Sequence, residues 1–510
     1  MQQPFEGEAH GRLLLVGCAS ALDQLEGRLG DATDPALVVG RLDIDAIGRS
    51  ELSSRLAEMV AACSPDLVLV SVPAVFAELL TSLRTILRRL SVPDRFVPTI
   101  DDLLAGVGPR SLPEVDLASL LDRADRPLDR VAVRRLCRGR RVLVTGAGGS
   151  IGSALCEAVA GLDPAELVMM DRSEHALFEI DRRIARRFPR LRRRASLQDV
   201  SERPGTLRLF EEARPNLVLH AAAHKHVPLS EDHPSEALRN NLEGSLSAVD
   251  AAIAVGASQF VLVSTDKAVA PSSVMGATKR LAEVAVQRRS ADAGLACSVV
   301  RFGNVLGSSG SVLEIWSSEI REGGPLGITD RRMTRYLMTI PEAAGLVLQS
   351  ASLVDRSTPT GLIHVLDMGE PVLILDLARR FAAAHGLELV VSGTGGPSAR
   401  PGTIACVETG IRPGEKLSEI LAHPGEDLES TAHPAIRAWH GVVPPASEID
   451  RILGLASSPA GASKEAVSGG IRRAIEAIES GGPPPVRIQT TRRRPMHAPR
   501  RLEERDLRGA

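Results

Sequence analysis

The sequence predicts an α/β protein: a Rossmann-type, doubly wound parallel sheet with a smaller C-terminal substrate-binding subdomain, preceded by a small Rossmann-like N-terminal domain. Strand-like apolar runs alternate with helical stretches over most of the chain, which is typical of parallel sheets covered by helices. A glycine-rich turn at 146–152 joins one such run to a helix. After about residue 300, glycine-rich loops interrupt the alternation. A chain of 510 residues is long enough for two or three domains.

The N-terminal domain is expected over 1–110. Its alternating elements are strands at 12–17, 36–40, 66–73 and 95–99 and helices at 19–29, 50–62 and 75–90. Only Gly17 remains in its first turn, where a dinucleotide-binding turn needs several glycines. We therefore expect a Rossmann-like domain that lacks an intact dinucleotide turn.

Composition divides the rest of the chain. A linker with short helices is expected at 111–137, a second α/β domain at 138–300 and a substrate-binding part at 301–445. Further helices are expected at 446–479. The last residues, 480–510, are rich in Pro and Arg and lack apolar periodicity, so we expect a disordered tail.

The second α/β domain opens with a strand, a glycine turn and a helix, in the segment RRVLVTGAGGSIGSALCEAVAG. Glycines at this spacing let a pyrophosphate approach the backbone N–H groups at the helix N-terminus. The apolar strand before the turn and the helix after it make a dinucleotide site a specific prediction. The expected contacts in the turn are Gly146, Gly149, Ser150, Ile151 and Gly152.

Acidic residues after the next two strands predict the adenosine side of this site. Asp171 ends the run ELVMMD, at a place where a carboxylate binds the ribose hydroxyl groups of NAD. Arg172 could instead pair with the 2′-phosphate of NADP, so NAD is favoured and NADP stays open. The structural alternative for Asp171 is a simple helix N-cap. Asp199 is expected near the adenine, and the small Ala221 lets the cofactor lie against the backbone.

The strand-like run QFVLVS delivers Thr265, Asp266 and Lys267 to its carboxyl end, where ligands bind in open α/β sheets. Lysine usage draws attention to these positions, because the chain has 56 arginines but five lysines. Lysine can act as a base, whereas arginine does not readily lose its proton. Lys225, Lys267 and Lys279 all fall beside the predicted cleft.

A series of segments identifies a family by its order along the chain: TGAGGSIGS, DRSE, AAAHKHVPL, NNLEGS, STDKAV, VMGATKR, RFGNVLGSSGSV, MTRYLMTIPEAAGLVLQ, VLDMGEP and GIRPGEKLSE. Over about 138–440 the chain resembles the polysaccharide-biosynthesis nucleotide-sugar epimerases and dehydratases of the extended short-chain dehydrogenase/reductase type. Such enzymes usually have a tyrosine four residues before the lysine that corresponds to Lys279, and here that position is Met275. The methionine resembles the long, configuration-retaining branch of UDP-N-acetylglucosamine 4,6-dehydratases.

Two departures from that branch stand out in the sequence. We expect no membrane helices before the N-terminal domain, where the branch usually has them, and Ala270 stands where the branch usually has Asn. The second departure is expected to alter the geometry of the loop after Lys267.

The resemblance implies a UDP-N-acetylglucosamine 4,6-dehydratase, which oxidises C4, removes water across C5 and C6 and returns hydride to C6, for surface polysaccharide or glycan biosynthesis. Thr265 would hold O4, Asp266 would relay the O4 proton or protonate the leaving hydroxyl, and Lys267 would be the base at C5. Met275 and Lys279 would contact the cofactor. The implied UDP-sugar contacts are Lys225, Asn304, Ser311, Val312, Arg335 and Arg412. A nucleotide-sugar C4 epimerase and a non-catalytic NAD(P)-binding regulatory protein are the alternatives.

Composition also indicates which partners and which cellular location to expect. Acidic and basic residues nearly balance, 63 against 61, so no nucleic-acid partner is expected. The sequence lacks a membrane-spanning apolar run and a signal peptide, so we expect no membrane span and a cytoplasmic protein. Six scattered cysteines without a C-x-x-C pair predict reduced thiols and no metal site. We expect a homo-oligomer.

Overall fold

The computed structural model describes most of the chain between residues 12 and 480. The described residues are 12–30, 38–45, 47, 51–72, 79, 83, 86–87, 90, 92–97, 117, 120–121, 126–321, 324–355, 362–391, 403–422, 428–440, 444–456 and 462–480. Most of the helix expected at 75–90, part of the expected linker and the tail after residue 480 lie outside this set.

The N-terminal residues form a separate four-stranded parallel sheet in the order β2-β1-β3-β4. Its elements are β1 (Leu13–Gly17), α1 (Ala19–Gly30), β2 (Val38–Asp43), α2 (Leu52–Cys63), β3 (Leu67–Ser71) and β4 (Asp94–Phe96). The core between sheet and helices consists mainly of Leu, Val and Ile side chains. At the N-terminus of α1, the backbone N–H of Ala19 donates to Asp45 Oδ2 at 2.9 Å. A carboxylate of the chain itself therefore occupies this helix end.

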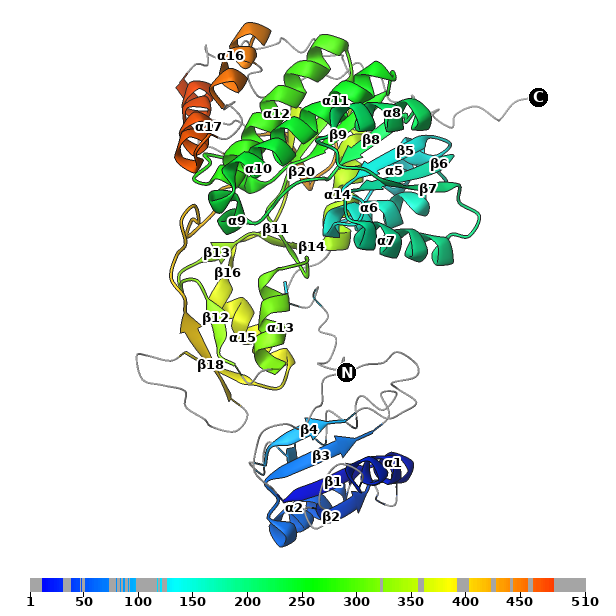
Figure 1. Cartoon of the computed structure of the whole chain (residues 1–510), viewed down its shortest axis with the longest axis vertical. Coiled ribbons are helices and arrows are strands. Elements are labelled where there is room, and N and C mark those ends of the chain that lie inside the picture. Colours follow the sequence, from blue (N-terminus) through cyan, green and yellow to red (C-terminus); the bar gives the residue numbers. More distant parts are fainter. Residues whose placement is uncertain are drawn as a thin grey trace, which may run out of the picture.

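A nine-stranded sheet forms the middle layer of the main domain, in the order β19-β20-β15-β10-β9-β8-β5-β6-β7 (Figure 1). Its strands are β5 (Arg141–Thr145), β6 (Glu166–Asp171), β7 (Arg193–Leu197), β8 (Leu217–His220), β9 (Gln259–Val263), β10 (Ala296–Arg301), β15 (Leu362–Leu366), β19 (Glu429–Ser430) and β20 (Ile436–His440). The strands from β7 to β15 in this order run parallel to one another. Strand β20 pairs antiparallel with β15, and β19 pairs antiparallel with β20. The order reverses between β5 and β8, where open α/β sheets bind ligands.

Helices cover both faces of this sheet, which confirms the predicted doubly wound fold class (Figure 1). One face packs against α5 (Arg130–Cys137), α6 (Ser150–Ala160), α7 (Glu174–Arg187) and α14 (Ile340–Ser352). The other packs against α8 (Arg203–Ala213), α11 (Gly244–Ala254) and α12 (Val274–Ala293). Helix α5 falls inside the range expected as a linker, yet Val133, Leu136 and Cys137 are buried in the main core. Its apolar face, spaced three and four residues apart, explains this difference.

A smaller part of the chain builds its own core around Trp316, next to the main sheet. Its elements are β11 (Asn304–Leu306), α13 (Val312–Arg321), β12 (Leu326–Ile328), β13 (Thr334–Arg335), β14 (Leu337–Thr339), β16 (Val372–Leu373), α15 (Ile374–Ala384), β17 (Glu388–Val391) and β18 (Thr403–Glu408). The strands pair as β12-β18-β17, β11-β14 and β13-β16. Several of these strands follow directly from the ends of central strands and helices, so loops of this part meet the carboxyl edge of the main sheet.

Two further helices pack against α12 of the main domain. They are α16 (Ala446–Ala456) and α17 (Lys464–Ser480), and they share an apolar cluster with α12 and with the short helix α10 (Pro234–Leu238). Among the residues that the structure describes, no helix is both long and apolar enough to span a bilayer. All six cysteines are unpaired.

Candidate active site

The glycine turn lies between β5 and α6, at the point where the strand order reverses. A Cβ atom on Gly146 would lie 2.7 Å from the backbone N of Ala222, which follows β8. A Cβ atom on Gly152 would lie 1.9 Å from the carbonyl oxygen of Gly146. Gly146 also has a φ of 65°, in the region that favours glycine. Only glycines permit this close approach. Gly149 is the N-cap of α6, and its N–H donates to the carbonyl oxygen of Gly146 at 3.0 Å.

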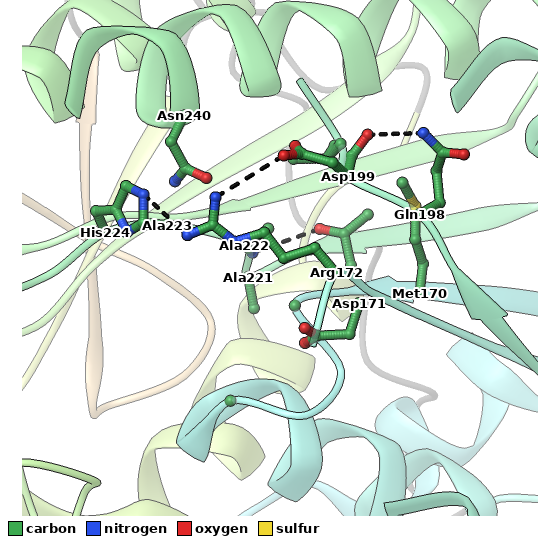
Figure 2. A pocket seen from close by; sticks show the side chains of 14 residues that line it. Met170, Asp171, Arg172, Gln198, Asp199, Ala221, Ala222, Ala223, His224 and Asn240 are labelled. Atoms are coloured by element: carbon green, nitrogen blue, oxygen red, sulfur yellow. Dashed lines mark hydrogen bonds and ion pairs between the residues drawn. The ribbon is translucent and has the colours of Figure 1, made fainter. Parts of the chain in front are cut away.

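A cavity opens beside this turn (Figure 2). It brings together the predicted cofactor residues Gly146, Gly149, Asp171, Arg172, Asp199 and Ala221. Gln198, His224 and Asn240 also line it and were not predicted. The first two of these follow the strands β7 and β8, so strand order would have pointed to them once the sheet was known.

Asp171 holds the glycine turn in place. Its Oδ2 accepts a hydrogen bond from the N–H of Gly148 at 2.9 Å, and its Oδ1 accepts one from the N–H of Ser173 at 2.8 Å. Ser173 is the N-cap of α7. The carboxylate thus connects the end of β6 to the turn while it faces the cavity, and it is not itself the helix cap.

Arg172 lies across the cavity between Asp199 and His224 (Figure 2). Its guanidinium is 3.0 Å from His224 Nε2, 3.8 Å from Asp199 Oδ2 and 3.5 Å from Glu236 Oε1. Burial opposes ionisation of Asp199, but hydrogen bonds from Ser201 and the nearby arginines lower its pKa below the usual value. The positive charge of Arg172 is therefore matched by two carboxylates.

A buried polar chain runs behind the cavity. The Thr145 hydroxyl lies 2.7 Å from His220 Nδ1, and His220 Nε2 lies 3.0 Å from the hydroxyl of Ser245, which donates to Asn241 O. Burial lowers the pKa of His220 to about 3, so its ring is neutral. Between the helices α10 and α11, the chain forms the π-helix η3 (Arg239–Glu243). The buried Asn241 amide explains this, because it bonds His224 and Thr278 instead of solvent.

Thr265, Asp266 and Lys267 lie together at the end of β9, where the turn η4 (Asp266–Ala268) begins. The Thr265 hydroxyl donates to Asp266 Oδ1 at 2.9 Å, and Lys267 Nζ donates to the same oxygen at 3.0 Å. Lys267 Nζ also donates to Asn304 Oδ1 at 2.9 Å. Asp266 is fully buried, and its Oδ2 has no hydrogen-bond partner among the described residues.

Met275 and Lys279 lie one turn apart on α12 and are both buried. Lys279 Nζ donates to the carbonyl of Val263 at 2.7 Å, and burial lowers the pKa of Lys279 to about 8. A Cβ atom on Gly276 would lie 2.2 Å from the carbonyl oxygen of Lys267, so the start of α12 is in direct contact with the segment 265–267.

A buried ion pair that sequence reasoning missed supports the same segment. Glu283 Oε1 accepts hydrogen bonds from the Ser264 hydroxyl at 2.6 Å and from Arg301 Nε at 2.9 Å. Burial opposes the charge on Glu283, but Arg301 together with Arg280 lowers its pKa to about 2. The pair joins α12 to β10 behind Thr265, a contact that depends on strand order and has no signal in local sequence.

The structure brings some of the predicted substrate contacts together and separates others. Lys225 Nζ donates to Ser308 Oγ at 3.2 Å and to Ser309 O at 2.6 Å, and burial lowers the pKa of Lys225. The same turn carries Ser311, whose buried hydroxyl has no partner among the described residues, and Val312, the first residue of α13.

The two predicted arginines have different surroundings. Arg335 is buried, and its guanidinium donates to the backbone carbonyls of Thr334 and Leu417. The Arg412 side chain is 59% exposed and pairs with Glu415, three residues later in the same loop. Within the described residues, no group of His, Cys, Asp and Glu side chains could hold a metal ion.

Comparison with known proteins gives the chain a family context. Residues 142–440 match the model of a family described as polysaccharide biosynthesis protein. The capsular polysaccharide biosynthesis protein CapD of Staphylococcus aureus is 39% identical over 70% of this chain and 58% of its own length. The probable polysaccharide biosynthesis protein EpsC of Bacillus subtilis is 37% identical over 74% of this chain and 60% of its own length. This chain therefore spans about 60% of these relatives.

A relative named UDP-N-acetylglucosamine 4,6-dehydratase (inverting), from Campylobacter jejuni, is 33% identical over 56% of this chain and 77% of its own length. Among solved structures, Pen from Bacillus thuringiensis is similar with a TM-score of 0.52 and 25% identity, over 60% of this chain and 91% of that chain.

Proposed function

This chain belongs to the family of polysaccharide biosynthesis proteins, and we propose that within it the chain is an NAD-dependent UDP-N-acetylglucosamine 4,6-dehydratase. The observation that carries the proposal is the cluster of Thr265, Asp266 and Lys267 beside the dinucleotide cleft. Three potential proton carriers within hydrogen-bond distance are what a reaction with proton transfers at O4, C5 and O6 requires. The relationship to a protein named as such a dehydratase supports the same activity.

The cavity beside the glycine turn fits a dinucleotide. Gly146 and Gly152 leave room for a diphosphate above the N-terminus of α6, and Asp171 faces the place of the adenosine ribose. Arg172 already faces the carboxylates of Asp199 and Glu236, which favours NAD over NADP because a 2′-phosphate would compete with both. A dinucleotide held by these residues would supply the hydride chemistry between C4 and C6 of the sugar.

Asp266 is proposed as the group that carries a proton from O4 to O6. Thr265 binds the sugar at O4 and passes the O4 proton to Asp266 Oδ1, which lies 2.9 Å from its hydroxyl. Asp266 then protonates the hydroxyl that leaves C6, so that water departs and the carboxylate is restored. The buried Asp266 Oδ2 supports this role, since a substrate hydroxyl would provide its missing partner.

Lys267 is proposed as the base at C5. It removes the C5 proton once the neighbouring C4 is a ketone, and it returns a proton to C5 when hydride reaches C6. Asn304 and Asp266 fix its amino group from two sides at 2.9 and 3.0 Å. No tyrosine can take over this chemistry, because the chain has one tyrosine and Met275 stands four residues before Lys279.

The turn at 308–312 is proposed to hold the UDP diphosphate. The unpartnered Ser311 hydroxyl lies where α13 begins, and Lys225 binds the same turn. Helix N–H groups and an ammonium group together suit a phosphate. Arg335 contributes indirectly, by fixing the backbone at Leu417. Arg412 is the exposed candidate for direct contact with the diphosphate.

The test is incubation of the full chain with NAD and UDP-N-acetylglucosamine in D₂O, followed by NMR of the product. A 6-deoxy-4-keto sugar with deuterium at C5 supports the dehydratase. Formation of the C4 epimer without deuterium at C5 would instead support an epimerase, an activity that the names of some similar proteins carry. No product from a panel of UDP-hexoses would refute an enzymatic role.

A further inference from the structure

The turn between the catalytic segment and α12 has an unfavourable backbone conformation at Ala270. Its φ is 41°, and residues with a Cβ other than Asn and Asp rarely adopt such values. Ala270 is exposed, so core packing does not hold it in this conformation. A turn in this state relaxes unless neighbouring groups fix it.

Lys416 supplies that fixation from another part of the chain. Its Nζ donates to the carbonyl oxygen of Val269 at 3.1 Å and to that of Ala270 at 2.8 Å. One ammonium group therefore binds the two carbonyls next to the strained φ. Lys416 has no part in the roles proposed above for Lys225 and Lys267.

The loop that carries Lys416 is itself fixed on both sides. Before it, the Gly414 carbonyl accepts a hydrogen bond from the Ser272 hydroxyl at 3.1 Å, and a Cβ on Gly414 would lie 2.9 Å from Ser273 Cβ. After it, the Leu417 carbonyl accepts from Thr334 N and Arg335. Hydrogen bonds on both sides of Lys416 thus hold its loop in place.

We propose that Lys416 is a positioning residue that holds the turn at Ala270, and through it the catalytic segment, from the loop that also carries Arg412. The contact between Gly276 and the carbonyl of Lys267 transmits the position of the turn, because α12 begins directly after it. The catalytic consequence rests on the proposed function of Lys267, whereas the structural consequence does not.

The structural arm of the test uses amide hydrogen exchange on the full chain, followed by mass spectrometry of peptides that cover 268–276. Lys416→Met is expected to speed exchange in this segment. Ala270→Asn in the same chain is expected to restore slow exchange, because Asn tolerates the positive φ. The matched control is Lys464→Met, which removes a lysine that bonds Asp232 and not the turn. Unchanged exchange in Lys416→Met, or no restoration by Asn, would overturn the proposal.

The catalytic arm measures kcat and KM with UDP-N-acetylglucosamine. Lys416→Met is expected to lower kcat by about 10- to 100-fold, which is the scale of small misplacements near reacting atoms. KM is expected to change less than about threefold, because the binding groups remain. Ala270→Asn should recover most of kcat, a result that a purely structural role of Lys416 would not give. If the wild-type chain has no dehydratase activity, the proposed function fails while the exchange data still decide the role of Lys416.

Discussion

At the scale of single residues, the surroundings of Asp266 limit what its two oxygens can do. Oδ1 already accepts from Thr265 and Lys267, whereas Oδ2 is buried without a partner in the described part of the chain. An unsatisfied buried carboxylate oxygen is costly unless a ligand or proton completes it. Asp266 is thus the residue whose substitution should separate chemistry from binding.

Asp266→Asn should lower kcat by about 10²- to 10⁴-fold, the usual contribution of a general acid or base, while the Kd for UDP-N-acetylglucosamine stays similar. The amide keeps the size of the side chain but cannot carry the proton. Turnover and calorimetric binding check this. The exposed Asp232→Asn serves as the control and should keep full turnover. Normal kcat in Asp266→Asn would remove the residue from the mechanism.

His220 should make folding stability depend on pH between about 6.5 and 3. Its pKa falls from 6.5 to about 3 on folding because the ring is buried. In this window the unfolded chain binds more protons, so stability is complete above pH 6.5 and decreases as the pH falls towards 3. The slope contributed by one group approaches about 1.4 kcal/mol per pH unit.

Denaturant unfolding of the wild-type chain and of His220→Gln across this range measures the effect. The variant lacks the titrating ring, so the difference in unfolding free energy between the two proteins should shrink as the pH falls. A constant difference would mean that His220 is not buried neutral in the folded protein.

At the scale of elements, local sequence predicts strands and helices where apolar periodicity is strong. The glycine turn, the strand before Thr265 and the alternation of the main domain follow from it. The π-helix η3 does not, because it depends on the hydrogen bonds of Asn241 to His224 and Thr278, which are distant in sequence. Local sequence does not predict the contacts of Glu283 and Lys416 for the same reason. Only the strand order and the loop packing bring these residues to the segment around Thr265 and Lys267.

Gly152→Ala should weaken cofactor binding by about tenfold or more. Its Cβ would lie 1.9 Å from the carbonyl of Gly146, so the turn must open and its N–H groups move away from the diphosphate. Loss of one such charge-assisted hydrogen bond corresponds to about tenfold or more in Kd for NAD. Calorimetric titration measures this. Gly161→Ala on the same helix is the matched control, since its nearest neighbour would be 3.6 Å away, and it should bind NAD normally.

At the scale of the whole molecule, the last described helices are part of the main core. Val467, Ile471 and Ile475 of α17 pack with Leu281 and Ala285 of α12. The helix that carries Met275 and Lys279 is therefore covered by a segment almost two hundred residues later in the chain. Overall stability and the site share this contact.

Ile471→Ala should lower the unfolding free energy by about 2–5 kcal/mol, because it removes a buried side chain and leaves a cavity. Chemical denaturation checks the value. Glu479→Ala, an exposed change on the same helix, should alter stability by less than about 0.5 kcal/mol. Equal effects of the two substitutions would show that α17 does not contribute to the core.

The Asp45 carboxylate at the start of α1 has a thermodynamic consequence for the N-terminal sheet. The helix end that would otherwise attract a phosphate is satisfied by a residue of the same chain, at 2.9 Å from Ala19 N. A folded domain that needs a ligand there gains stability in proportion to the logarithm of the ligand concentration. A phosphate at this helix end would have to displace Asp45, so we expect the stability of the N-terminal sheet to be independent of nucleotide concentration.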